Sequence, residues 1–239
     1  MSTPAPTGHG KAVASMFSRI VPWYDMLNTV LSLGIDRYWR KRLVQEVRLG
    51  STGTVLDLAA GTLDVSLAIR CRYPQARVPA LDFCPPMLFQ GQKKLRGANA
   101  QAISPVAADA KLLPLPDACV DAVTMAFGIR NILPRHEAFA EMARVLVPGG
   151  RACILEFGSG KQRVWGGVYN VYLDYILPRI GKIISQDASA YTYLADTIRN
   201  FPVAEALEEE MREAGFAAAW HIPLTSGIVC LHIAEKARS

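Results

Sequence analysis

The 239-residue sequence has few cysteines, and none of them is paired at a metal-binding spacing. The five cysteines are an odd number without a CxxC motif, which argues against a disulfide framework and against a zinc knuckle. The four histidines form no cluster along the chain, so we expect no metal site. Positive charge is not concentrated either. The net charge is +5, but the positively charged residues are scattered and form no arginine-rich tract, so nucleic acid is not an expected partner.

A long uninterrupted apolar run is also missing. The stretch Ala214–Ala234 carries no Asp, Glu, Lys or Arg, but glycine, proline, hydroxyl residues and histidines interrupt it. It is therefore predicted to form two strands joined by a turn and not a membrane-spanning helix. The first ten residues lack the basic start and the apolar core of a signal peptide. We expect a cytoplasmic protein, at most peripheral at the inner face of the plasma membrane.

What the chain does contain is an alternation of short apolar runs and helical periodicity, which is typical of an α/β sheet. The first run, at residues 54–58, is flanked by Gly53 and Gly61, as expected for a strand buried on both faces. Further strands are predicted at residues 77–81, 101–107, 119–127, 151–157, 216–222 and 228–234, with helices at 137–146 and 203–211. The pattern predicts a doubly wound, mostly parallel seven-stranded sheet with an antiparallel last strand.

One domain is predicted at residues 11–239, after a flexible tail at residues 1–10. Residues 11–50 form an N-terminal helical extension in this interpretation. Residues 159–200 are long, aromatic and apolar, and an insertion of that size after the fifth strand is typically a lid or a wall of the substrate site.

Acidic residues lie at or just after the ends of the first three predicted strands, where an α/β sheet binds its ligands. Asp57 precedes a small-residue turn containing Gly61, and the spacing differs from GxGxxG. A dinucleotide is thus disfavoured, whereas a nucleoside that carries an amino acid is accommodated. Asp82 suits the two hydroxyls of a ribose, and Asp109 suits an adenine amino group. The alternative is an ordinary turn, with Asp64 capping the next helix.

Several segments resemble a known family. The most specific are YDMLN at residues 24–28, FGIRN at 127–131 and YLADTIR at 193–199. Supporting segments are LGIDRYWR at 33–40, RVLVPGG at 144–150, LEF at 155–157 and LTSGIV at 224–229. Together they resemble the UbiE family of quinone-biosynthesis C-methyltransferases over nearly the whole chain.

The resemblance implies a class I methyltransferase fold that moves a methyl group from S-adenosyl-L-methionine to a ring carbon of a polyprenylated quinol. It also implies that Thr62 and Ala110 join the three acids and Gly61 in the cofactor pocket. The family pattern usually has a glycine where this chain has Leu63, and Ala60 and Ala126 are lesser departures. The Leu63 side chain either narrows the pocket or packs into the core.

Catalysis is assigned to three residues. Carbon methylation of a quinol needs an electron-rich ring, and hence the loss of a hydroxyl proton. We expect Arg130 to stabilise the developing phenolate and to order a water, with Tyr24 and Asn131 positioning the ring. An arginine is a poor literal base because its guanidinium stays charged. The alternative for Arg130 is a salt bridge that ties a loop down.

A lipid-tailed acceptor predicts contact with an anionic membrane. Cations surround Tyr38 and Trp39 in the sequence: Arg37, Arg40, Lys41, Arg42 and Arg48. The apolar stretch Val164–Pro178 is a candidate groove for the tail. A solvated helix face and ordinary core packing are the alternatives.

Demethylmenaquinol is the expected acceptor. A ubiquinol precursor, another lipidic acceptor such as a sterol, and a non-catalytic quinone-binding module stay open, as does a homo-oligomeric state.

Overall fold

The computed structural model describes residues 8–50, 52–158 and 188–238. Seven strands form one sheet in the order β3-β2-β1-β4-β5-β7-β6. Their bounds are β1 Val55–Leu58, β2 Val78–Asp82, β3 Ile103–Ala107, β4 Val120–Ala126, β5 Leu146–Phe157, β6 Ala218–Leu224 and β7 Val229–Glu235. β7 pairs antiparallel with both of its neighbours, and every other pairing is parallel. The predicted sheet and its antiparallel last strand are confirmed.

Three strand starts differ from the sequence prediction by two residues or more, and one of them is β6, which begins at Ala218 instead of residue 216. Residues 101 and 102 belong to α6 (Ala98–Ala102), so β3 begins only at Ile103. β5 begins at Leu146 instead of Arg151, because Leu146 pairs with Val120 before a shift in register. The stretch Ala214–Ala234 contains β6, the turn η4 (Thr225–Gly227) and most of β7, as predicted. No helix in the described ranges is long and apolar enough to cross a membrane.

Helices cover both faces of the sheet, which explains why all four residues of β1 are buried. Side chains of α3 (Asp36–Glu46) and α4 (Asp64–Arg72) pack on one face, around Leu43 and Ile69. Side chains of α7 (Arg135–Val145) and α11 (Ala204–Glu213) pack on the other face, around Phe139 and Leu207. The short helix α5 (Pro85–Gln92) follows β2 and carries Leu88 into the first of these clusters.

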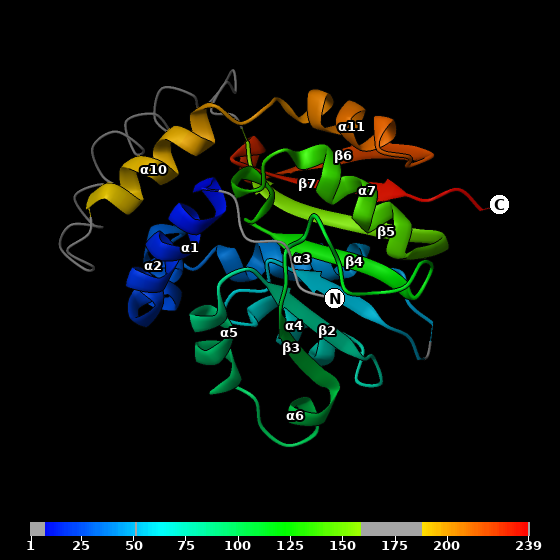
Figure 1. Ribbon diagram of the computed structural model, residues 1–239, viewed down its shortest axis with the longest axis horizontal. Coiled ribbons are helices and arrows are strands. Elements are labelled where there is room, and N and C mark those ends of the chain that lie inside the picture. Colours follow the sequence, from blue (N-terminus) through cyan, green and yellow to red (C-terminus); the bar gives the residue numbers. More distant parts are fainter. Residues whose placement is uncertain (1–7, 51, 159–187, 239) are drawn as a thin grey trace.

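Three further helices gather beyond the carboxyl ends of the parallel strands (Figure 1). They are α1 (Gly8–Ile20), α2 (Tyr24–Leu31), which follows the turn η1 (Val21–Trp23), and α10 (Ala188–Arg199). A small apolar cluster joins them: Met16, Ile20, Leu27, Ala195 and Ile198. The tail is shorter than expected, because α1 already begins at Gly8. Of the expected insertion, residues 159–187 lie outside the described residues, so its role as a lid stays a prediction.

Candidate active site

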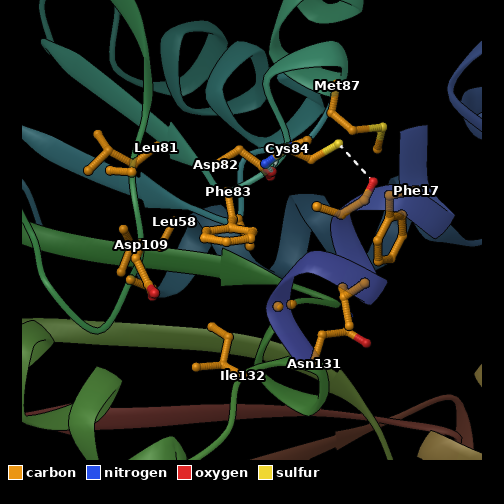
Figure 2. Close-up of a pocket in the computed structure, with 18 of the residues that line it drawn as sticks. Phe17, Leu58, Leu81, Asp82, Phe83, Cys84, Met87, Asp109, Asn131 and Ile132 are labelled. Carbon is orange, nitrogen blue, oxygen red and sulfur yellow. Dashed lines mark hydrogen bonds between the residues drawn. The ribbon is translucent and has the colours of Figure 1, made fainter. Parts of the chain in front are cut away.

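A pocket of about 120 Å³ lies where β1, β2 and β4 end, and α1 closes it from outside the sheet (Figure 2). Its wall from the sheet side includes Leu58, Asp82, Asp109, Ala110, Gly128 and Asn131. Its wall from the N-terminal helices includes Val13, Ala14, Phe17 and Tyr24. In Figure 2, Asp82, Phe83 and Asp109 lie at one end of the pocket, and Phe17 and Asn131 lie at the other.

Asp82 is fixed at the end of β2 by two backbone donors. Gly61 N donates to Oδ2 at 2.8 Å, and Cys84 N donates to Oδ1 at 2.7 Å. Burial raises the pKa of the carboxyl, and these two hydrogen bonds oppose the rise. Each oxygen keeps a second lone pair for a ligand, so the carboxylate can accept from two neighbouring hydroxyls. Asp82 lines the pocket, and its contact with the cofactor stays a prediction.

Asp109 and Ala110 line the same pocket beyond β3, as expected. The Asp109 Oδ1 atom accepts from Lys111 N at 2.9 Å, which leaves its other oxygen available. Phe83 lies between the two acids in Figure 2, and Phe17 of α1 lies on the far side. An aromatic ring beside two acids offers a flat apolar contact for a nucleobase.

Asp57 was expected in the pocket, but it is 1% exposed and does not line it. Its register partner on β4 is Thr124, whose Oγ1 donates to Oδ1 at 2.9 Å, and Ser66 Oγ donates to Oδ2 at 2.6 Å. Burial raises the pKa of Asp57 to about 7, while these hydrogen bonds lower it. Asp57 supports the turn from beneath, and Gly61, with φ of 52°, is the turn residue that faces the pocket.

Thr62 is also placed differently from the prediction. Its Oγ1 donates to Oδ1 of Asp25 at 2.5 Å, and Asp25 in turn pairs with Lys94 at 2.5 Å. Thr62 is 3% exposed and is not part of the pocket wall. Its hydroxyl therefore fastens α2 to the turn after β1.

Leu63 does not narrow the pocket, which decides between the two alternatives left by the sequence. The side chain is fully buried among the residues that α3 and α4 pack on the sheet. Gly91 of α5 makes room for it, since a Cβ at Gly91 would lie 2.6 Å from Leu63 Cγ. Because Gly91 has no side chain, the fold has room for a leucine at position 63, where the family pattern usually has a glycine.

Tyr24 and Asn131 line the same pocket and come from different parts of the chain. Asn131 ends η2 (Ile129–Asn131), directly after β4, and its Oδ1 accepts from Tyr193 Oη at 3.1 Å. Burial raises the pKa of both tyrosines, and the charge of Arg130 opposes the rise. Sequence reasoning had not selected Tyr193 as a site residue, although its segment carried the resemblance.

The guanidinium of Arg130 was expected to be available to the acceptor, but an ion pair holds it. Its Nη1 donates to Glu156 Oε1 at 2.5 Å, and the two side chains are 7% and 0% exposed. The guanidinium also lies 5.5 Å from the centre of the Phe157 ring. The Nε atom is buried and has no hydrogen-bond partner in the described part of the chain. The salt bridge named as the alternative is therefore present, together with one unused donor.

The sequence reasoning missed the contribution of α1 to the pocket. Val13, Ala14 and Phe17 lie at i, i+1 and i+4 and reach the pocket together. Cys84 also lines it, and its Sγ lies 3.4 Å from Ser18 Oγ. An amphipathic pattern at residues 13–20 was the available signal, but a pattern does not say which surface a helix covers.

The basic segment around Trp39 was expected to contact a membrane, but much of it is buried or paired within the protein. Trp39 is 4% exposed and donates from Nε1 to Thr225 Oγ1 at 2.7 Å, so it is a core residue. Three of the five cations are paired: Arg40 with Asp36 and Asp64, Arg42 with Glu46, and Arg48 with Glu235. The candidate groove at residues 164–178 lies outside the described residues. Within the described ranges, no group of His, Cys, Asp and Glu side chains could hold a metal ion.

Solved structures share this architecture at low sequence identity. The [4+2]-cyclase SpnF has a TM-score of 0.71 at 16% identity, covering 98% of each chain. The methyltransferase complexed with the Trm112 activator of Haloferax volcanii has a TM-score of 0.66 at 17% identity, covering 92% of this chain and 97% of the other. The sheet order and these neighbours define the class I methyltransferase fold.

The sequence comparisons narrow this class. The ubiE/COQ5 methyltransferase family matches residues 7–236, and the chain belongs to this family. A relative from Deinococcus radiodurans, named demethylmenaquinone methyltransferase, is 43% identical and covers 95% of this chain and 93% of its own. A relative of the same name from Thermus thermophilus is 42% identical over 92% of this chain and 100% of its own. A Syntrophotalea carbinolica relative named ubiquinone/menaquinone biosynthesis C-methyltransferase UbiE is 43% identical, covering 93% of each chain.

Proposed function

We propose that this methyltransferase transfers a methyl group from S-adenosyl-L-methionine to a ring carbon of demethylmenaquinol, giving menaquinol. The observation that carries the proposal is a pocket with acids at one end and Asn131 at the other, with Tyr24 in its lining, in a chain 43% identical to a protein named for this substrate. The two ends suit two different reactants, one a nucleoside and one an aromatic ring.

The acid end has the chemistry that the cofactor requires. Asp82 would accept from the two ribose hydroxyls, because both of its oxygens are already oriented by backbone donors. Asp109 and Ala110 would meet the adenine edge, with Phe83 against the ring face. When bound, the cofactor supplies a methyl group on a positively charged sulfur. The protein's own part is to hold the nucleoside so that this methyl points away from the acids.

The other end has to hold the acceptor ring close to that methyl. Alignment of two reactants by itself supplies about 7–11 kcal/mol of a barrier in well-oriented cases. Tyr24 from α2 and Asn131 from η2 approach the pocket from separate elements, so a ring held between them is fixed in orientation. Tyr193 Oη holds Asn131 Oδ1, which leaves the Asn131 amide nitrogen to donate toward a ring hydroxyl.

Arg130 is proposed to act through its unused Nε–H. Glu156 binds Nη1 and so fixes the plane of the guanidinium beside Tyr24 and Tyr193. A buried donor without a partner costs about 1–3 kcal/mol. A phenolate oxygen, or a water that accepts the hydroxyl proton and passes it on, would satisfy that donor. The role is stabilisation of negative charge, not removal of the proton by the guanidinium itself.

A ubiquinol precursor is the second candidate acceptor, because relatives named for both quinones match as well as those named for one. Both rings would present a hydroxyl beside the carbon that is methylated. The prenyl tail of either acceptor is apolar, so we also propose that the enzyme works at a membrane surface.

The test is direct. The purified protein is incubated with isotopically labelled S-adenosyl-L-methionine and chemically reduced demethylmenaquinone, and the product is identified by mass. We expect one labelled methyl on the ring carbon. The Asp82→Asn variant should bind the cofactor at least ten-fold more weakly in calorimetry, whereas Asp117→Asn, at an exposed carboxylate, should not change it. Absence of any methylated quinol with the wild-type protein would overturn the proposal.

A further inference from the structure

We propose that the outer face of α2 and the beginning of α3 form a docking surface for an anionic lipid bilayer. Apolar side chains of this surface enter the interfacial region, while Arg37 and Lys41 contact lipid phosphates. The inference rests on the proposed function, since a polyprenylated quinol resides in a bilayer. It assigns the membrane contact to particular residues, most of which differ from those that the sequence suggested.

The apolar part of this surface is concentrated in a short stretch of the chain. Eleven large hydrophobic side chains are exposed in the described residues, and six of them belong to residues 23–38. They are Trp23, Met26, Val30, Leu33, Ile35 and Tyr38, with exposed fractions of 46%, 44%, 40%, 87%, 36% and 51%. Single exposed apolar side chains are normal, but a group of this kind marks an interaction site. Trp23, Met26 and Val30 are spaced i, i+3, i+7 and so share one face of the helix.

The adjoining face of α2 is already used inside the molecule. Tyr24 lines the pocket, and Leu27 is 3% exposed within the cluster that joins α1, α2 and α10. A surface helix ordinarily has one apolar face, which packs on the core, and one polar face. The apolar stripe of α2 is wider than the part that packs inside the molecule, so Met26 and Val30 are left exposed and need an apolar or interfacial surrounding other than this chain. Figure 1 shows α2 at the edge of the molecule.

Leu33 is an independent sign of an external contact. Its backbone is left-handed with φ of 52°, and Gly34 follows with φ of 76°. A left-handed leucine is disfavoured by about 1 kcal/mol or more. At 87% exposure the side chain contributes almost nothing to the core that would offset this strain. An apolar residue at the tip of such a turn is explained if the tip inserts into an apolar phase.

Positive charge accompanies the apolar patch. Arg37 and Lys41 lie one turn apart on α3 and, with Arg72 of α4, line a groove of about 570 Å³ beside α2. None of these three forms an ion pair with another described residue, whereas the acids in the groove are neutralised. Asp25 pairs with Lys94 at 2.5 Å, and Asp64 pairs with both Lys94 at 2.7 Å and Arg40 at 3.1 Å. The groove therefore presents net positive charge to an anionic headgroup.

This charge pattern favours a bilayer over a second copy of the chain. In a two-fold dimer, the same patch would face itself and bring Arg37 and Lys41 near their own copies. Like charges at such an interface are unfavourable. Trp23 and Tyr38 are instead the aromatic types that concentrate at the headgroup level of membranes, next to cations. Lipid phosphates supply the counter-charge that a second copy lacks.

The test is flotation of the full-length protein with vesicles, without cofactor or quinol. One set of vesicles is phosphatidylcholine alone, and the other adds phosphatidylglycerol. Two variants probe the surface: Leu33→Asn, which suits a left-handed backbone, and Arg37→Gln with Lys41→Gln. Matched controls elsewhere are Phe89→Asn, at another exposed apolar side chain, and Arg77→Gln with Arg96→Gln, which also removes two charges.

We expect wild type to prefer the anionic vesicles and to lose binding at high salt. The two-charge variant should partition roughly 30-fold less, from the attraction of each cation to an anionic surface. Leu33→Asn should partition about ten-fold less, because the variant loses the favourable transfer of a leucine side chain from water into the bilayer. Both controls should match wild type.

Equal partitioning of all variants, or no binding of wild type to anionic vesicles, would overturn the docking surface. So would a wild-type dimer that Leu33→Asn converts to a monomer, since a second copy would then be the occupant. Because flotation needs no turnover, it can succeed while the methylation assay fails, and the reverse, so the two proposals are judged separately.

Discussion

Arg130 Nη1 lies 2.5 Å from Glu156 Oε1, and neither side chain is more than 7% exposed. The pair connects η2, where Asn131 faces the pocket, to the end of β5. Glu156 Oε1 also accepts from the backbone nitrogen of Phe157 at 2.9 Å, and Oε2 accepts from the backbone nitrogen of Arg130 at 3.3 Å, so both carboxylate oxygens are held. This ion pair therefore fixes the wall of the site on which the acceptor ring is proposed to rest.

Breaking this pair from one side should be costly. We expect Glu156→Gln and Arg130→Met each to lower the free energy of unfolding by about 3–5 kcal/mol, because each leaves a buried charge uncompensated. The double variant should regain much of that stability but not turnover, since the guanidinium is gone. Urea unfolding and single-turnover methylation measure the two effects. The pair Arg135–Glu210, at 2.6 Å and partly exposed, is the control, and its double variant should keep wild-type turnover. Wild-type turnover in Arg130→Met/Glu156→Gln would contradict the assigned role.

Leu63 should matter for stability and not for cofactor affinity. We expect Leu63→Ala to destabilise the fold by about 2–5 kcal/mol, as a fully buried leucine does when it is truncated. Its affinity for S-adenosyl-L-methionine should stay within two-fold of wild type, because the side chain packs against Gly91 and not in the pocket. Thermal unfolding and calorimetry are the two measurements. A large gain in affinity would show instead that Leu63 obstructs the cofactor.

Stability should fall as pH rises through the titration range of Asp57. The pKa of this buried carboxyl is about 7 in the folded protein and 3.8 ordinarily. Between these values the folded state keeps a proton that the unfolded chain has released, so raising the pH favours unfolding. The loss is on the order of 4 kcal/mol, at about 1.4 kcal/mol per pKa unit. Urea unfolding of Asp57→Asn should lack this slope, while Asp117→Asn should keep it. An unchanged pH profile in Asp57→Asn would contradict the assignment.

His232 should act in the opposite direction. It is 1% exposed, and burial lowers the pKa of its imidazole to about 4, with the nearby His221 lowering it further and Glu208 opposing. As pH falls from 6.5 toward 4, the unfolded chain takes up a proton that the folded state resists, so stability is lost. His232→Leu should be less sensitive to acid in this window by about 2–3 kcal/mol. His136→Gln, at an exposed histidine, serves as the comparison. Equal acid sensitivity of wild type and His232→Leu would reject the prediction.

The sheet and two of its acids could be predicted from sequence because each depends on local pattern. The buried run of β1 between glycines indicates a strand covered on both faces. Carboxyl ends of parallel strands share one edge of a sheet, so the sequence alone predicts Asp82 and Asp109 at the same edge. The start of β5 was missed, because the early pairing of Leu146 with Val120 depends on a neighbouring strand that is distant in sequence.

The remaining site residues depended on contacts that local pattern does not encode. Asp57 and Thr62 have the residue types of ligand-binding positions. The carboxylate of Asp57, however, accepts hydrogen bonds from Ser66 and Thr124. The hydroxyl of Thr62 donates to Asp25. Arg130 lies where expected along the chain, but Glu156 decides where its guanidinium points. Each of these partners comes from another element of the fold.

By itself, the sequence determined a mostly parallel α/β sheet with an antiparallel last strand, the edge of the sheet where a ligand is expected, and the family. The tertiary structure decided which side chains face the cavity and which are held beneath it, that Leu63 belongs to the core, and that α2 carries an apolar face on its outside. The physical reason is that strand periodicity and strand ends are local properties. The direction of a polar side chain is set by the nearest partner that packing brings to it.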